Sequence, residues 1–445
     1  MDSIEEPTFV EEPWGGVRVD NDKRPKEPIL NEEISKRPWW NRTVMGFSLA
    51  SLFSDLGHEW VTSLTPGFLT MIGAPPIALG LVEGVSGVGQ SLAGLWGGRK
   101  ADTASHRMLY IAVGYLATIL KALYGLVWFW PWLILIRTVA WIGRGMRGPL
   151  RDTLIAESVP ANAYGRALGI RESLDTVGGI AGPILGAVLL ARVGYRSLFL
   201  WTAVPGFLAF FSVIALVRDR RMQVSNPEGE TTTRTNVDAA ESTHTVTSGT
   251  IHYPSAFKRL LVVDTLFSVG NVVPSFFILV VVQDLKPVLG AVHASVLGII
   301  LYAWYNLVYA LTTLVAGSLT DRSGPRPVLI SGFFACLLSL VGFAFLPATV
   351  VVDTILFTLA GVATGTLESS QKTYVRLVLP QYIRGRGLGL HASWIGFGTL
   401  ASGILIGGLW TIGDQSWGFA ATAAVVLLAL ILLVTTVPTV RAKAD

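Results

Sequence analysis

Ionisable side chains interrupt an apolar stretch near the start of the hydrophobic part of the chain. Residues 43–62 contain Asp55, His58 and Glu59, and Glu83 follows early in the next apolar stretch. At 100° per residue the first three fall on one face of a helix, and the opposite face is apolar. Charged groups are costly in hydrocarbon, so they face a bundle interior or a water-filled cavity. We therefore expect all four residues to line a central cavity.

Three interpretations of these residues are open. A desolvated carboxylate could exchange protons and couple a process to a proton gradient. Asp55, His58 and Glu59 could instead bind a divalent metal ion, because carboxylate oxygens and an imidazole suit borderline metals. In the third interpretation the acids only pair with Lys121 and Arg137 and hold the helices together.

A later apolar stretch is unusually basic. Arg137, Arg144 and Arg151 are spaced seven residues apart and share one helix face, with Arg147 about 60° away. Arg137 and Arg144 could bind an anionic ligand or neutralise a neighbouring carboxylate, so both belong to the candidate site. We expect Arg147 and Arg151 to pair with acids at the same end of the helix, namely Asp152, Glu157 or Asp102.

Other charged residues are spaced for pairing along a helix. Glu368 and Lys372 are four residues apart in the favourable order for a helical ion pair, and we include both in the candidate site. Arg171 and Asp175 have the same spacing and could neutralise each other. We expect Asp264 to lie at the membrane interface and His391 to have a packing role.

The composition is that of a polytopic membrane protein. Of the 445 residues, 51% are hydrophobic and 14% are charged, whereas soluble domains have about 25% charged residues. Continuous apolar runs of about 20 residues indicate helices rather than the alternating strands of a barrel. Basic residues fall in alternate loops and not in one patch, which is the positive-inside pattern and argues against nucleic-acid binding. The single cysteine, Cys336, excludes an internal disulfide.

Two sets of six apolar spans flank a polar segment. The predicted spans are 43–62, 76–97, 108–130, 132–156, 167–191 and 196–217, then 256–282, 290–316, 328–347, 351–377, 386–411 and 417–438. They define a bundle over 42–217, a linker over 218–255 and a second bundle over 256–438, with tails at 1–41 and 439–445. The linker composition is that of a disordered segment. The basic loops place the linker and both termini in the cytoplasm.

Two sequence patterns stand out against this background. A charged loop that leads from Gly to Asp and then to basic residues occurs once in each half. Its residues are Gly98, Asp102 and Arg107 in the first half and Gly317, Asp321, Arg322 and Arg326 in the second. A second pattern of small residues and proline lies in the fifth span and comprises Gly178, Gly182, Pro183 and Gly186. Such small residues allow two helices to approach closely.

The loop pattern resembles motif A of the major facilitator superfamily of transporters, and the glycine–proline pattern resembles the motif C of its proton-coupled antiporters. Arg137 resembles the motif-B arginine, which in that family is tied to proton coupling. The resemblance implies an all-α polytopic membrane protein with twelve transmembrane helices in two six-helix bundles. It also implies that Asp102 and Asp321, with Arg151, latch the outward-facing state at the cytoplasmic side.

The function that this resemblance implies is secondary active transport of a small solute by alternating access, with proton-coupled export indicated by motif C. The alternatives are a divalent-metal exporter and a non-transporting receptor or scaffold. We predict that the protein is not an enzyme, needs no cofactor and acts as a monomer. Its expected partners are the solute, protons and the lipid bilayer, without nucleic acid, and its expected location is the bacterial inner membrane.

Overall fold

The structure is a computed structural model that describes residues 38–104, 106–217 and 253–440. Most of the predicted tails and linker lies outside these ranges. Every element of the described part is a helix. The helices of the first half are α2 (Arg42–Met71), α3 (Pro76–Thr103), α4 (Arg107–Ile119) with the 3-10 helix η2 (Leu120–Leu126), α5 (Pro131–Ser158), the 3-10 turn η3 (Ala161–Ala163), α6 (Tyr164–Trp201) and α7 (Ala203–Leu216). Those of the second half are α8 (Ser255–Gly270), α9 (Pro274–Leu289), α10 (Ala291–Ser323), α11 (Pro325–Phe345), α12 (Val350–Val378), α13 (Gln381–Ile412) and α14 (Gln415–Thr436).

Local sequence signals set where several helices begin. The Asn41 side chain accepts hydrogen bonds from the backbone N–H groups of Thr43 and Val44, both at 3.0 Å, and so caps α2. Four helices begin at a proline, which suits the first turn because its missing N–H would have no helical partner there: α3, α5, α9 and α11.

The helices form twelve spans within the described residues, six in each half. Eight stretches are long and apolar enough to cross a membrane by length and composition alone. One of them, Tyr164–Leu216, contains two spans, because Gly194 takes a left-handed conformation (φ 72°) that only glycine adopts readily and the chain reverses there. The remaining spans are α2, α3 and α5. They carry most of the intramembrane charges and are therefore less apolar than the other spans.

The seventh span is broken, which corrects the prediction of one continuous helix over 256–282. The helix α8 ends at Gly270, and α9 begins at Pro274 after an extended turn. Proline has no N–H to donate and disfavours helical geometry in the residue before it. The Asn271 carbonyl exposed by the break accepts a hydrogen bond from the Ser402 hydroxyl at 3.0 Å, so this backbone group is satisfied inside the protein.

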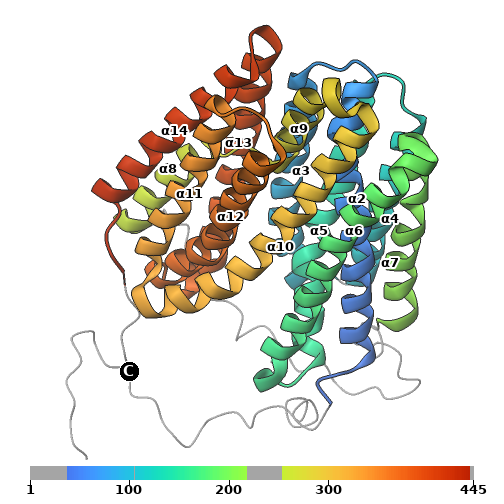
Figure 1. Ribbon diagram of the computed structural model, residues 1–445. Coiled ribbons are helices and arrows are strands. Elements are labelled where there is room, and N and C mark those ends of the chain that lie inside the picture. The colour runs from blue at the N-terminus through green and yellow to red at the C-terminus, as the bar shows by residue number, and fades with distance from the viewer. Residues whose placement is uncertain (1–37, 105, 218–252, 441–445) are drawn as a thin grey trace, which may run out of the picture.

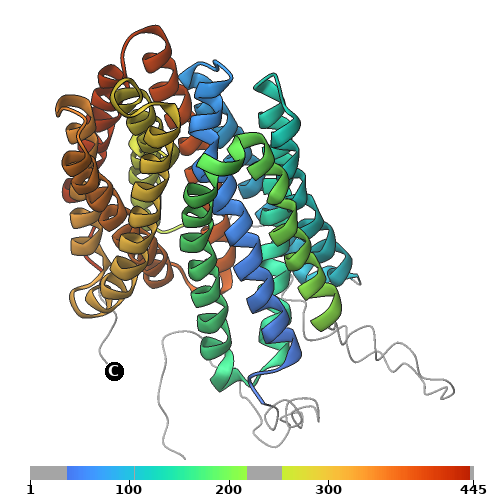
Figure 2. The same cartoon turned by 45° about the vertical axis from the view of Figure 1, so that its right-hand side comes forward.

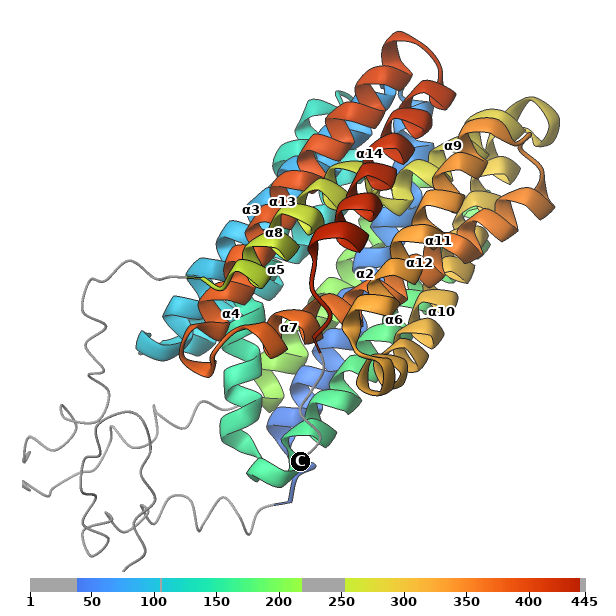
Figure 3. The same cartoon turned by 90° about the vertical axis from the view of Figure 1, so that its left-hand side faces the viewer.

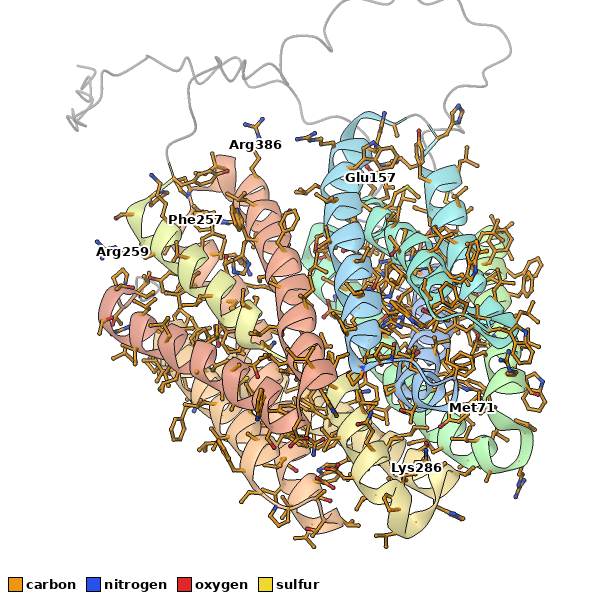
Figure 4. All side chains as sticks on the ribbon, turned by 90° about the horizontal axis from the view of Figure 1, so that it is seen from above. Met71, Glu157, Phe257, Arg259, Lys286 and Arg386 are labelled. Atoms are coloured by element: carbon orange, nitrogen blue, oxygen red, sulfur yellow. The ribbon has the colours of Figure 1, made fainter. Side chains whose placement is uncertain are left out.

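The two halves stand side by side, with α2–α7 in blue to green and α8–α14 in yellow to red (Figure 1). Inside the first half, α2 packs against both α6 and α7 (Figure 2). Between the halves, α13 lies along α3 (Figure 3), and α10 packs against α6. Met71 and Lys286 lie toward one end of the molecule, and Glu157 and Arg386 lie toward the other (Figure 4).

Candidate functional site

A cavity of about 1370 Å³ lies between the halves and opens toward the end that carries Glu157 and Arg386. Its walls come from α2, α3, α5 and α6 of the first half and α13 of the second. Arg99 near the end of α3 and Arg386 near the start of α13 line its mouth, so the opening lies beside the first motif-A loop. This end is the one that the loop charges predict to be cytoplasmic.

The deepest charged group of the cavity joins α2, α5 and α6. Arg144 donates a hydrogen bond to Asp55 across 2.6 Å, and Asp175 of α6 belongs to the same cavity wall. All three residues line the cavity. The wall therefore brings two acids and one guanidinium from three helices to one place.

The place of Asp175 corrects the predicted pairing with Arg171. Arg171 binds its neighbour Glu172 instead, at 3.0 Å. The i,i+4 spacing allows a pair but does not enforce one, because a long side chain can turn along the helix to a different acid. Asp175 therefore lines the cavity, whereas the sequence predicted it only as a partner of Arg171.

Two other acids of the first half do not line the cavity, contrary to expectation, but bridge the halves on its closed side. Glu59 lies one helical turn beyond Asp55 and accepts a hydrogen bond from the Tyr302 hydroxyl at 2.6 Å. Glu83 accepts one from the Ser275 hydroxyl at 3.0 Å and one from Arg137 at 2.6 Å. Each bridge joins a carboxylate of one half to a hydroxyl of the other.

The structure contradicts the proposed metal site at Asp55, His58 and Glu59. Within the described residues, no group of three or more His, Cys, Asp or Glu side chains is arranged to hold a metal ion. Nε2 of His58 does lie 3.7 Å from Oε1 of Glu59, but Asp55 binds Arg144 instead of joining them. The Nδ1 of His58 lies 3.2 Å from the Nζ of Lys121, while Asp55 and Glu59 bind Arg144 and Tyr302 as described above.

Charge pairing explains part of the basic stripe on α5. The predicted pairing of Arg137 with an acid is confirmed, because this fully buried side chain binds Glu83. The predicted pairing of Arg151 with Asp152 is also confirmed, at 3.0 Å. Arg147 is different. It donates to the Ser54 hydroxyl at 2.5 Å and to the Gly114 carbonyl at 3.3 Å, and none of the carboxylates in the described part forms an ion pair with it.

The motif-A residues make contacts within their own halves. Arg107 binds Glu157 through two hydrogen bonds of 2.8 Å, and Arg326 donates to the Val434 carbonyl at 2.6 Å. Asp321 is exposed, and the side chain of Asp102 lies outside the described residues. The predicted latch belongs to a state in which this end is closed, so it stays a prediction.

The motif-C residues form the contact between α6 and α2. A Cβ atom on Gly178 would overlap the carbonyl oxygen of Leu52, and one on Gly182 would overlap that of Leu56. The two backbones therefore touch along this line, as expected for small residues at a helix interface. This contact fixes α6, and with it Asp175, against the helix that carries Asp55.

The second half contributes a row of tyrosines, one ion pair and one Asp–His contact. The rings of Tyr302, Tyr305 and Tyr309 are stacked along α10, with centroids 5.7 Å and 6.5 Å apart. Tyr309 donates to Glu368, which also binds Lys372 at 2.9 Å, so the predicted Glu368–Lys372 pair forms.

Sequence reasoning missed the Asp–His contact of this half. Asp264 is completely buried, and its carboxylate lies 2.7 Å from Nε2 of His391. The sequence had predicted Asp264 at the interface and a packing role for His391. The two residues are 127 positions apart. No local spacing could have connected them, because the contact exists only where α8 packs against α13.

The comparisons with known proteins agree with this architecture. The sequence model of the Major Facilitator Superfamily matches residues 44–300 and 265–445. The chain therefore belongs to the major facilitator superfamily. It is 26% identical over 406 residues to an uncharacterised MFS-type transporter of Methanocaldococcus jannaschii, a match that covers 91% of this chain and 96% of that protein. It is also 26% identical over 404 residues to the multidrug resistance protein MdtG of Dickeya zeae, with 87% and 93% covered.

A solved structure shares the fold. It is a bacterial homologue of the human lysosomal transporter Spinster in an inward-facing, unoccupied conformation, with a TM-score of 0.67 at 16% identity, covering 90% of this chain and 97% of that one. The predicted all-α fold of twelve helices in two bundles is confirmed. The protein is an integral membrane protein of a superfamily of small-molecule transporters.

Proposed function

We propose that this protein is a secondary active transporter that exports a small solute in exchange for protons by alternating access. The observation that carries the proposal is the group of Asp55, Asp175 and Arg144 in the wall of the cavity between the halves. A midplane cavity between two helical bundles is the usual binding place in such transporters.

The contacts between the halves support alternating access. On the closed side the halves are joined by a few hydrogen bonds, from Tyr302 to Glu59 and from Ser275 to Glu83. On the open side the cavity separates them. Rocking of one bundle against the other would exchange these contacts for new ones at the mouth, where the motif-A residues lie.

The carboxyl pair supports proton coupling. With one proton, Asp55 and Asp175 together carry a single negative charge, which Arg144 balances. Without it, two carboxylates face one guanidinium in a partly desolvated site, which is unfavourable. The pair can therefore take up and release one proton as its surroundings change between states.

The direction and the location follow from sequence and relatives. The motif-C pattern and the name of the multidrug resistance relative support export. The loop charges place the cavity mouth and both termini in the cytoplasm, and we assign the protein to a bacterial inner membrane.

The coupling can be tested without knowing the solute. Two exposed residues lie on either side of the mouth: Ala156 at the end of α5 and Gly385 at the start of α13. Both are replaced by cysteine, and Gly385 has open space for the added side chain. In proteoliposomes, energy transfer between dyes on this pair, named here the mouth pair, reports whether the mouth is open. We expect an imposed pH gradient to shift the distribution of energy-transfer efficiencies in the wild type and not in Asp55→Asn.

The matched control is Asp284→Asn, because that carboxylate binds Gln415 outside the cavity. This variant should respond to the gradient as the wild type does. A wild type that does not respond, or an Asp55→Asn variant that responds fully, would show that this carboxyl group does not couple the protein to protons. A mouth that never closes under any condition would favour the receptor alternative.

A further inference from the structure

We propose that the transported solute is an organic anion with an apolar body, held by Arg147 and Arg171 in the wall of the cavity. The inference rests on the proposed function, because it assigns the class of solute for the same cavity. Its basis is two buried guanidinium groups in the cavity wall: in the described part Arg147 has only neutral partners, and the Nε of Arg171 has no hydrogen-bond partner.

The cavity wall is strongly basic. The described residues that line it include two carboxylates, Asp55 and Asp175, and Asp55 is already bound to Arg144. The wall also contains six arginines, namely Arg99, Arg144, Arg147, Arg151, Arg171 and Arg386. Three of them form ion pairs: Arg144 with Asp55, and Arg151 and Arg171 with Asp152 and Glu172, which lie outside the cavity lining. A cationic solute would meet this excess of like charge, whereas an anionic solute would reduce it.

Position separates these arginines into two kinds. Arg99 and Arg386 are exposed at the mouth, where the positive-inside rule by itself accounts for them. Arg147 is only 3% exposed, and its partners in the described part are neutral: the Ser54 hydroxyl, the Gly114 carbonyl and the ring of Tyr115, 3.8 Å from the guanidinium carbon. Neutral partners orient a guanidinium but leave its charge in place, and a buried charge without a counter-ion is costly.

Arg171 has a hydrogen-bond donor without a partner among the described residues. It is 7% exposed, and its Nη2 binds Glu172, whose side chain is largely exposed to solvent. Its Nε is buried and has no hydrogen-bond partner among the described residues. An unpaired buried donor in a ligand cavity is a place where a ligand acceptor restores the lost hydrogen bond.

The chemistry of the two side chains defines the head group. A guanidinium presents a planar fork of donors that matches the oxygens of a carboxylate, a phosphate or a sulfonate. The wall opposite provides the apolar part, because Leu92 and Leu95 of α3 and Trp394 and Phe397 of α13 line the same cavity. A solute with one anionic head and an aromatic or aliphatic body fits both surfaces.

Four probes with one common body test the assignment: 2-naphthoate, 2-naphthyl phosphate, 2-naphthylmethylammonium and 2-naphthol. Binding is measured by thermal shift and by fluorescence titration on the full chain in lipid nanodiscs. We expect at least one anion to bind, and the ammonium and the naphthol to bind at least tenfold more weakly. Comparing naphthoate with naphthyl phosphate tells which head group is preferred.

The variants locate the site. Arg147→Gln and Arg171→Gln should each weaken anion binding at least tenfold, while Arg147→Lys, which keeps the charge, should retain more of it than Arg147→Gln. The control Arg259→Gln removes an exposed arginine (labelled in Figure 4) that is not part of the cavity lining, and it should change the Kd less than twofold. If Arg147→Gln unfolds, Arg171→Gln and Arg147→Lys still decide the question.

Three results would overturn the inference. They are preferential binding of the ammonium, anion binding that survives both glutamine substitutions, and no binding of any probe. Because binding is measured at equilibrium without a pH gradient, its outcome is separate from that of the mouth-pair experiment. A protein that responds to protons but binds the cationic probe would keep the proposed function and lose the anion assignment.

Discussion

The hydrogen bond from Tyr302 to Glu59 should favour the state seen here, in which the cavity opens at the Glu157–Arg386 end. It joins α10 of one half to α2 of the other across 2.6 Å on the closed side of the cavity. When the closed side opens, this bond must break. The substitution Tyr302→Phe removes the hydroxyl and keeps the ring, which stacks on Tyr305. It should therefore destabilise the present state relative to the state that opens on the opposite side.

The size of the effect follows from the type of bond. A hydrogen bond to a charged group contributes about 1.5–3 kcal/mol. Each 1.4 kcal/mol changes an equilibrium constant about tenfold. The ratio of mouth-open to mouth-closed molecules should therefore fall by roughly 10- to 150-fold in Tyr302→Phe, if the lost bond is not replaced in the other state.

The mouth pair measures this ratio directly, as the relative areas of the low-transfer and high-transfer populations. The matched control is Tyr309→Phe, because Tyr309 belongs to the same row of rings but donates to Glu368 within its own half. We expect no shift in the control. An unchanged ratio in Tyr302→Phe, or an equal shift in Tyr309→Phe, would refute the idea that this bond holds the halves together.

Two further predictions concern stability, measured as the free energy of unfolding in detergent. Gly182→Ala should lower the free energy of unfolding by about 1–3 kcal/mol, because the added Cβ overlaps the Leu56 carbonyl. Gly179→Ala should have little effect, because its Cβ would stand 3.8 Å from the nearest atom. Equal losses in both variants would contradict the backbone contact. Arg137→Gln should cost about 3–5 kcal/mol, because it leaves Glu83 buried without its cation. Adding Glu83→Gln should recover part of that loss, and a double variant as unstable as the single one would argue against the pair.

The sequence by itself determined the class of the protein and most of its helices. Span length and composition identified twelve membrane helices, since a helix must present about 20 apolar residues to cross a bilayer. Charges within those spans marked α2, α3 and α5 as cavity-forming helices, because hydrocarbon does not tolerate them elsewhere. Residues four apart on a helix are neighbours whatever surrounds them, so the Glu368–Lys372 pair was also predictable.

The tertiary structure decided which charges meet and on which side of the cavity they lie. The close approach of α6 and α2 at Gly178 and Gly182 brings Asp175 into the same cavity wall as Asp55, although local spacing favoured a pair with Arg171. The contact of α8 with α13 pairs Asp264 with His391. Such pairs depend on the rotation and tilt of packed helices, which are set by backbone contacts between segments far apart in the chain. A periodic pattern gives the face on which a residue lies, but only packing gives the residue that it faces.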